Sequence, residues 1–149
     1  MPSIKHKTYI KVSPRKVFTT LLSADEWNAW FTDDTTIHLN GDGKGEIRFR
    51  WTNKIDNSVI EDGGEITEMI PNERLVFQWS PAEQTTNVYF ELSPFKEGTL
   101  LTLTEEDYAK TDKDLDACIE CATGWGEALT LLKVYLELGF TFKEDLILA

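Results

Sequence analysis

Two cysteines three positions apart are the first candidates for chemistry in this chain. Cys118 and Cys121 have the C-x-x-C spacing of thiol–disulfide and zinc sites. A redox pair needs a helix N-terminus, where the helix dipole lowers the thiol pKa, but these residues fall about two turns into a predicted helix and among acidic residues. A zinc site needs about four ligands, and only His6 and His38 remain, far away in the sequence. We therefore predict buried structural cysteines, no bound metal and no cofactor.

The other polar residues form no recognisable catalytic motif. Neither histidine has a serine or cysteine partner in a nucleophile motif. The run Gly41-x-Gly-x-Gly45 leads into a predicted strand, whereas a phosphate-binding loop leads into a helix. Glu105 is the single carboxylate that we consider as a catalytic acid, because strand alternation puts it on the apolar side with Leu101 and Leu103. We predict that the chain is not an enzyme.

Length and charge limit the possible partners. The chain has 149 residues, which suits one domain spanning 1–149. Its 15 Lys and Arg against 26 Asp and Glu give a net charge of −11, which repels phosphate backbones and anionic lipid. Residues 1–7 are polar, and no apolar run approaches the ~18 residues of a spanning helix. We expect a cytoplasmic protein that neither binds nucleic acid nor inserts into a membrane.

Alternating apolar and polar residues predict an antiparallel sheet of six or seven strands. Short turns between the runs favour a meander, and Gly63-Gly64 predicts a bulge or sharp bend. Arg48 and Arg50 fall on the polar side of their strand, where we expect pairs with surface carboxylates. The segment around His38 is interpreted as a polar strand or a loop. The predicted strands are Ile4–Val12, Glu46–Thr52, Val59–Ile70, Leu75–Trp79, Val88–Leu92 and a run containing Leu101 and Leu103.

Helical patterns flank the sheet. Ser13-Pro14 and the capping box that begins at Ser23 start two short helices directly after the first strand. Thr111 caps one long helix that ends near Gly139. A curved sheet with one long terminal helix closes by wrapping around it, so we predict an α+β helix-grip domain. The apolar stripe expected to face the sheet comprises Leu115, Ile119, Ala122, Gly126, Leu129, Leu132 and Leu136.

The second half of this helix carries more apolar residues than one stripe requires. From Leu129 to Leu138, only Thr130, Lys133 and Glu137 are polar. The surplus should be covered by the apolar tail of residues 140–148 or by a second copy of the chain. We favour a homodimer.

Aromatic side chains give the best candidate for a binding site. Five Trp are more than a small core requires, and the strand rings lie on the side that faces the helix. Trp125 stands between Gly124 and Gly126, two costly helix residues that indicate either close backbone approach or space left open. The expected cavity residues are Trp30, Phe31, Phe49, Trp51, Phe77, Trp79, Phe90, Leu101, Leu103, Trp125 and Leu129.

Six short sequence motifs occur in the same order as in one known family. They are SPRKVF at 13–18, WNAWF at 27–31, the glycine-rich turn before Arg48 and Trp51, PNERLVFQW at 71–79, GTLLTLT at 98–104 and Gly124-Trp125. The chain resembles bacterial relatives of the C-terminal domain of the activator of the heat-shock-protein-90 ATPase, in the START-like helix-grip superfamily. The resemblance implies a helix-grip fold and a hydrophobic small molecule held between the sheet and the helix.

Three functions follow as hypotheses. The first is binding of a hydrophobic, aromatic or lipid-like small molecule in the cavity between the sheet and the C-terminal helix. The second is a chaperone-linked or stress-response protein-interaction module, which the family's namesake implies. The third is an enzyme of the aromatase/cyclase type, which a buried acid–base pair in the cavity would favour.

Overall fold

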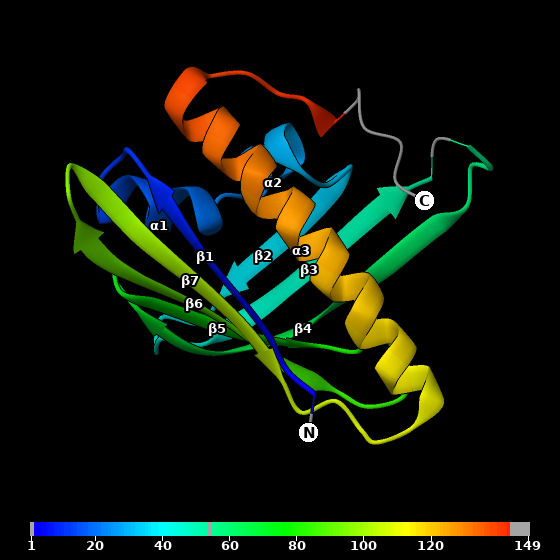
Figure 1. The fold of residues 1–149 in the computed structure, drawn as a ribbon. Helices are drawn as coiled ribbons and strands as arrows, with labels where there is room; N and C mark the ends of the chain where they lie inside the picture. Colours follow the sequence, from blue (N-terminus) through cyan, green and yellow to red (C-terminus); the bar gives the residue numbers. More distant parts are fainter. Residues whose placement is uncertain (1, 54, 144–149) are drawn as a thin grey trace.

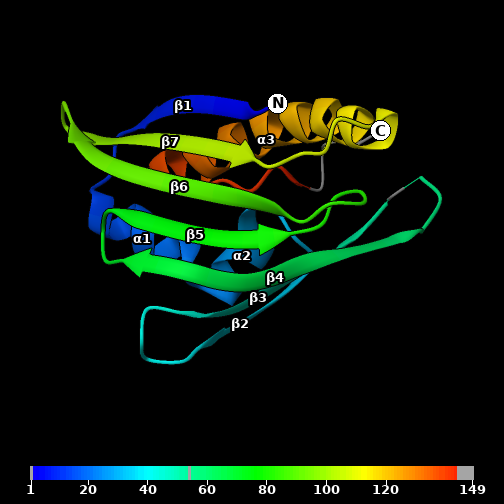
Figure 2. The same ribbon diagram turned by 90° about the horizontal axis from the view of Figure 1, so that it is seen from below.

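A seven-stranded antiparallel sheet and three helices make up the fold in the computed structural model, which describes residues 2–53 and 55–143. The strand order is β1-β7-β6-β5-β4-β3-β2, a meander from β2 to β7 that β1 joins beside β7 (Figures 1 and 2). The predicted helix-grip fold is confirmed. The elements are β1 (Ile4–Ile10), α1 (Pro14–Leu21), α2 (Ala24–Trp30), β2 (Asp34–Leu39), β3 (Gly45–Thr52), β4 (Val59–Ile70), β5 (Arg74–Trp79), β6 (Thr86–Phe95), β7 (Gly98–Glu106) and α3 (Asp112–Leu138).

The helix ends carry the caps that the sequence indicates. The hydroxyl oxygens of Ser13, Ser23 and Thr111 each accept a hydrogen bond from the backbone N–H three residues later. Gly139 ends α3 in the left-handed conformation, with φ of 73°. The strand that the sequence left open is β2, which contains His38 and pairs with β3 at the edge of the sheet.

Two adjacent glycines in β4 lie so close to the neighbouring strands that a side chain would not fit. Gly63 adopts a φ of +150°, and a Cβ there would lie only 2.2 Å from the carbonyl oxygen of Ile47 on β3. At Gly64 the same addition would meet the carbonyl oxygen of Gln78 on β5 at 2.3 Å. The β3–β4 register is continuous through both glycines, and the register shift lies between Ile66 and Glu68 in the β4–β5 ladder. The two glycines therefore provide a close approach of three strands, and the bulge follows them.

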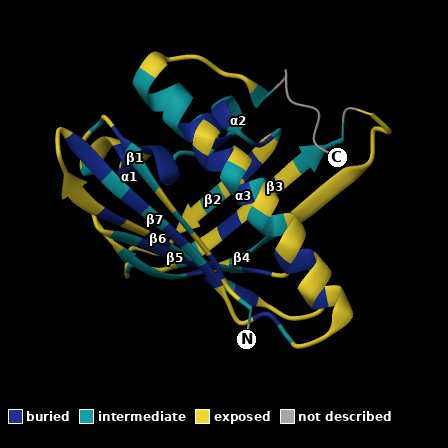
Figure 3. Cartoon of the chain, viewed as in Figure 1, coloured by how far each residue is buried: buried dark blue, intermediate teal, exposed yellow. Residues whose placement is uncertain are grey.

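The long helix α3 lies across the concave face, over the β1 side, while α1 and α2 cover the neighbouring part (Figures 1 and 2). Its predicted stripe is wrong in the N-terminal half, because Leu115 and Ile119 are exposed. Those turns bury small and polar residues instead, so the pattern of large apolar residues there marks the wrong side (Figure 3). The buried residues of α3 are Asp114, Ala117, Cys118, Trp125, Ala128, Leu129, Leu131 and Leu132.

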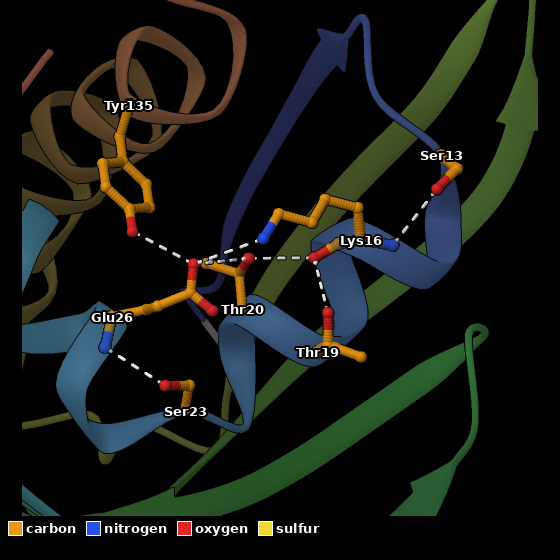
Figure 4. Close-up of polar contacts among 7 residues, drawn as sticks. All are labelled: Ser13, Lys16, Thr19, Thr20, Ser23, Glu26 and Tyr135. Atoms are coloured by element: carbon orange, nitrogen blue, oxygen red, sulfur yellow. Dashed lines mark hydrogen bonds and ion pairs between the residues drawn. The ribbon is translucent and has the colours of Figure 1, made fainter. Parts of the chain in front are cut away.

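A carboxylate joins all three helices (Figure 4). Glu26 of α2 accepts a hydrogen bond from the Tyr135 hydroxyl of α3 at 3.0 Å and from the Thr20 hydroxyl of α1 at 3.4 Å. Lys16 of α1 adds an ion pair to the same oxygen at 3.6 Å. This junction fixes the C-terminal half of α3 against the two short helices.

The segment after α3 turns back toward α2 (Figure 1). The Lys143 ammonium donates to the backbone carbonyls of Asn28 and Thr32, at the end of α2. Most of the apolar surplus on α3 is buried or half-buried within the chain, but Leu138, Phe140 and Phe142 are exposed. We call these three residues the C-terminal patch. The predicted cover by residues 146–148 lies outside the described residues. Within the described ranges, no helix is long and apolar enough to cross a membrane.

We expect Gly63→Ala to lower the free energy of unfolding by about 2 kcal/mol or more, because the methyl group collides with backbone that the β3–β4 ladder fixes. Gly41→Ala is the matched control, since Gly41 also has a positive φ of +86° but an added Cβ meets no described atom within 4 Å. Urea unfolding followed by far-ultraviolet circular dichroism measures both. Equal midpoints for the two variants would contradict the proposed close approach.

Candidate functional site

The rings predicted to line the cavity meet in one contact network. Phe49 of β3 lies 5.7 Å from Phe77 and 6.1 Å from Trp79, centroid to centroid. Trp27 of α2 was not among the predicted cavity residues, yet it is fully buried and lies 4.8 Å from Phe49. Trp27 lies three and four positions before Trp30 and Phe31, so helix periodicity already placed it on the same face as these two residues. The interior is therefore aromatic on both its sheet side and its α2 side.

The network continues to α3 through Trp125. This ring lies 5.2 Å from Trp79 and 5.7 Å from Phe90. Leu101 and Leu103 of β7 and Leu129 of α3 belong to the same buried cluster. All eleven predicted residues thus lie in this cluster or pack against it. Of these eleven, only Phe31 and Trp51 are half-buried, and their ring centroids are 5.6 Å apart.

A fully buried carboxylate sits within this aromatic interior. One oxygen of Glu105 accepts a hydrogen bond from the Trp125 indole N–H at 2.9 Å. The other accepts from the Trp79 indole N–H at 2.7 Å and from the Thr86 hydroxyl at 2.6 Å. No ion pair to Glu105 is found among residues 2–53 and 55–143, so these neutral donors are what stabilise the carboxylate. The arrangement connects β5, β6, β7 and α3.

Weakly acidic groups adjoin Glu105. Burial, followed by the neighbouring Cys121 thiol and the charge of Glu105, raises the pKa of Tyr108 far above its usual value. Burial raises the pKa of Cys121 to about 12, and it raises the pKa of Cys118 as well. The thiols therefore stay protonated at neutral pH, which agrees with the predicted structural role and disfavours redox chemistry. Within the described chain, no group of three or more His, Cys, Asp or Glu side chains is placed to hold a metal ion.

Two buried indole nitrogens, Nε1 of Trp30 and Nε1 of Trp51, have no hydrogen-bond partner among the described residues. Two other buried polar atoms of the described chain form no such hydrogen bond but have polar neighbours: Nε of Arg74 lies 3.3 Å from a Glu68 oxygen, and the Tyr108 hydroxyl adjoins Cys121 and Glu105. The Trp27 indole, by contrast, donates to the Leu21 carbonyl at 2.8 Å. A buried unsatisfied polar group costs about 1–3 kcal/mol, so these positions call for an explanation.

The two glycines beside Trp125 face different surroundings. A Cβ at Gly126 would lie 3.6 Å from the ring of His6, whose Nε2 bonds the Ala122 carbonyl at 3.0 Å. A Cβ at Gly124 would meet no described atom within 4 Å. Successive residues turn about 100° around a helix, so Gly124 lies on the flank of α3 away from His6 and β1. The sequence offered two explanations for these glycines, close backbone approach and open space. Open space is the explanation that fits Gly124.

Other candidate groups lie outside the aromatic interior. Arg48 and Arg50 pair with Glu46 and Asp34 at the surface, as predicted. A hollow of about 480 Å³ lies on the outer face of the sheet, and none of the predicted cavity residues lines it. It is bordered by Lys5, Lys7, Ile70, Glu73, Arg74, Glu91, Leu92, Ser93 and Thr102.

Replacement of Glu105 by Gln should lower the free energy of unfolding by about 2–4 kcal/mol, because an amide has one acceptor oxygen and its NH₂ would face a donor. Glu106→Gln, one residue later and exposed, should change stability by less than about 0.5 kcal/mol. Urea unfolding monitored by Trp fluorescence tests both. Equal stabilities would show that the three hydrogen bonds contribute nothing.

Comparisons with known proteins agree with this architecture. The family described as activator of Hsp90 ATPase homolog 1-like protein matches residues 11–137. A Staphylococcus saprophyticus protein of known structure is 21% identical, with 94% of this chain and 95% of that one covered and a TM-score of 0.72. The Aha1 dimer from Colwellia psychrerythraea is 25% identical, with 93% and 98% covered and a TM-score of 0.71. The AHSA1-like protein from Aeromonas hydrophila is 17% identical, with 93% and 94% covered and a TM-score of 0.73. Comparison with curated proteins finds no match. The chain belongs to the activator of Hsp90 ATPase homolog 1-like protein family, which the sequence resemblance predicted.

Proposed function

We propose that this protein binds a planar hydrophobic small molecule between the sheet and α3. The observation that carries the proposal is the continuous ring network, which extends from buried Trp125 through Trp79 to the half-buried pair Phe31 and Trp51. A flat ligand that enters at this pair would exchange ring–ring contacts for ring–ligand contacts of the same kind. Apolar burial contributes about 25 cal/mol per Å², and each aromatic stack adds up to about 1.5 kcal/mol.

The proposal is one of binding without catalysis. Both oxygens of Glu105 are already engaged by three donors, so the carboxylate is held as an acceptor and not presented to a substrate. Tyr108 keeps its proton because of its raised pKa. An aromatase/cyclase-type enzyme would need an acid or a base that is free to exchange a proton with its substrate.

Gly124 supplies the sharpest test of where the ligand binds. Gly124→Ala and Gly126→Ala should each stabilise α3 by about 0.5–1 kcal/mol, because Ala favours a helix interior. A methyl group at Gly124 also occupies the open space next to Trp125, so we expect fluorene to bind about tenfold more weakly to Gly124→Ala. Gly126→Ala, on the His6 side, should bind fluorene like the wild type.

Equilibrium dialysis gives the two affinities, and amide-shift mapping gives the location. Shifts confined to the outer face of the sheet, or equal loss of affinity in both glycine variants, would contradict the site. Failure of the wild type to bind fluorene, naphthalene or flavone at micromolar concentrations would contradict the function itself.

We also propose that the C-terminal patch is a contact between two copies of this chain. Leu138 and Phe140 are 62% and 58% exposed, and the Phe140 ring pairs with Phe142 at 6.1 Å, which places contiguous apolar surface in water. A relative of the same fold is described as a dimer. A chaperone or other stress-response partner is the second use for such a patch, and the family's namesake favours it. The two unpaired cysteines suit a reducing cytoplasm.

Sedimentation equilibrium at tens of micromolar should give twice the 17.0 kDa chain mass for the wild type. The double variant Phe140→Ser, Phe142→Ser should sediment as a monomer, because it removes the apolar area that association would bury. Phe95→Ser, at a similarly exposed phenylalanine on the β6–β7 hairpin, should stay dimeric. A monomeric wild type would exclude the dimer and leave the patch to a different partner.

A further inference from the structure

Two buried indole donors near Phe31 have no use within the described fold. Nε1 of Trp30 and Nε1 of Trp51 are both inaccessible to solvent, and neither has a hydrogen-bond partner in residues 2–53 and 55–143. The other three indoles are all bonded, to the Leu21 carbonyl and to Glu105. Phenylalanine would keep an apolar ring at positions 30 and 51 without stranding a polar atom, although it would fill less volume.

The rings that carry these two donors both contact Phe31. The Trp30 ring stacks on Phe31 at 5.3 Å, and the Trp51 ring meets the same Phe31 edge-on at 5.6 Å. Phe31 and Trp51 are also the half-buried members of the network, so this is where the aromatic interior approaches solvent. A ligand inserted beside Phe31 would therefore reach both indole rings.

This end of the interior has unsatisfied hydrogen-bond donors that the acceptors of the interior do not match. An indole N–H donates and cannot accept. The strongest acceptor of the interior, Glu105, already receives three hydrogen bonds, so it does not offset the two donors. The Tyr108 hydroxyl can both donate and accept, so it does not select either ligand type.

We propose that Trp30 and Trp51 are specificity-determining residues that select planar aromatic ligands with a carbonyl or similar acceptor oxygen. This inference rests on the proposed binding function and specifies its ligand class. The ligand oxygen accepts from one or both indoles, while its rings lie against Phe31 and the neighbouring network. The ligand oxygen thus supplies the acceptor that these donors lack among the described residues. A ligand that presents an N–H donor would leave the indoles unsatisfied and is discriminated against.

Three isosteric probes separate the possibilities: 9-fluorenone carries an acceptor, fluorene carries no polar atom, and carbazole carries an N–H donor. Equilibrium dialysis against the full chain should show 9-fluorenone bound about tenfold more tightly than fluorene, with carbazole the weakest. In ¹⁵N–¹H spectra, 9-fluorenone should move the indole N–H signals of Trp30 and Trp51 downfield, while those of Trp79 and Trp125 keep their Glu105-bonded positions.

Trp51→Phe and Trp30→Phe retain a ring and remove the N–H. The preference for 9-fluorenone over fluorene should shrink toward onefold in these variants. Because this ratio compares two ligands in the same variant, a loss of ring contact that weakens both ligands does not change it. If one variant fails to fold, the indole signals of the wild type still decide the question.

The outcomes distinguish this inference from the function on which it rests. Equal affinities for all three probes, or a 9-fluorenone complex in which both indole signals stay in place, overturn the selection for an acceptor and leave hydrophobic binding intact. If none of the probes binds, the binding function and the inference both fail.

Discussion

The position of α3 on the sheet depends on one buried carboxylate. Glu105 ends the inward row of β7, and its hydrogen bonds reach Trp79 on β5, Thr86 on β6 and Trp125 on α3. A carboxylate without a cation is costly to bury, so each of these donors must keep its place for the fold to remain favourable. Apolar contacts alone would allow α3 to slide or rotate over a smooth aromatic face. The directional hydrogen bond of the Trp125 indole, together with those that join α3 to His6 and Glu26, selects one helix position.

The same constraint divides the interior into a fixed part and an open part. Around Glu105 the donors are satisfied, and Tyr108 and Cys121 add buried groups that stay protonated. Toward Phe31 and Trp51 the donors are unsatisfied and the rings become half-buried. Gly124 adds open space on the flank of α3 away from His6. The proposed binding function requires such a division, with a rigid frame beside a part that can exchange contacts.

Local patterns predicted most of the fold and part of the site. Strand alternation, three hydroxyl caps and the left-handed Gly139 were all readable, because each depends on neighbours in the sequence. β2 was left open because its residues are mostly polar at the sheet edge, so alternation is weak. Leu115 and Ile119 were assigned to the wrong side of α3, since periodicity cannot tell an apolar residue that is buried from one that is exposed. The roles of Thr86 and Tyr108 were not predicted, because both depend on contact with Glu105. Thr86 lies on a different strand from Glu105, and Tyr108 follows the end of β7.

The unsatisfied indoles also bear on how binding and stability are linked. A stranded N–H costs about 1–3 kcal/mol, which is a substantial part of the 5–15 kcal/mol by which domains are stable. The hydrogen bonds of Glu105 and Glu26 stabilise the fold at positions away from Phe31, and this stabilisation offsets the cost of the unsatisfied indoles. A ligand that supplies an acceptor would satisfy the indoles only in the folded chain, because the unfolded chain exposes them to water. Binding and folding would then stabilise each other through the same two atoms, and the free protein would be weakest at the place where its ligand enters.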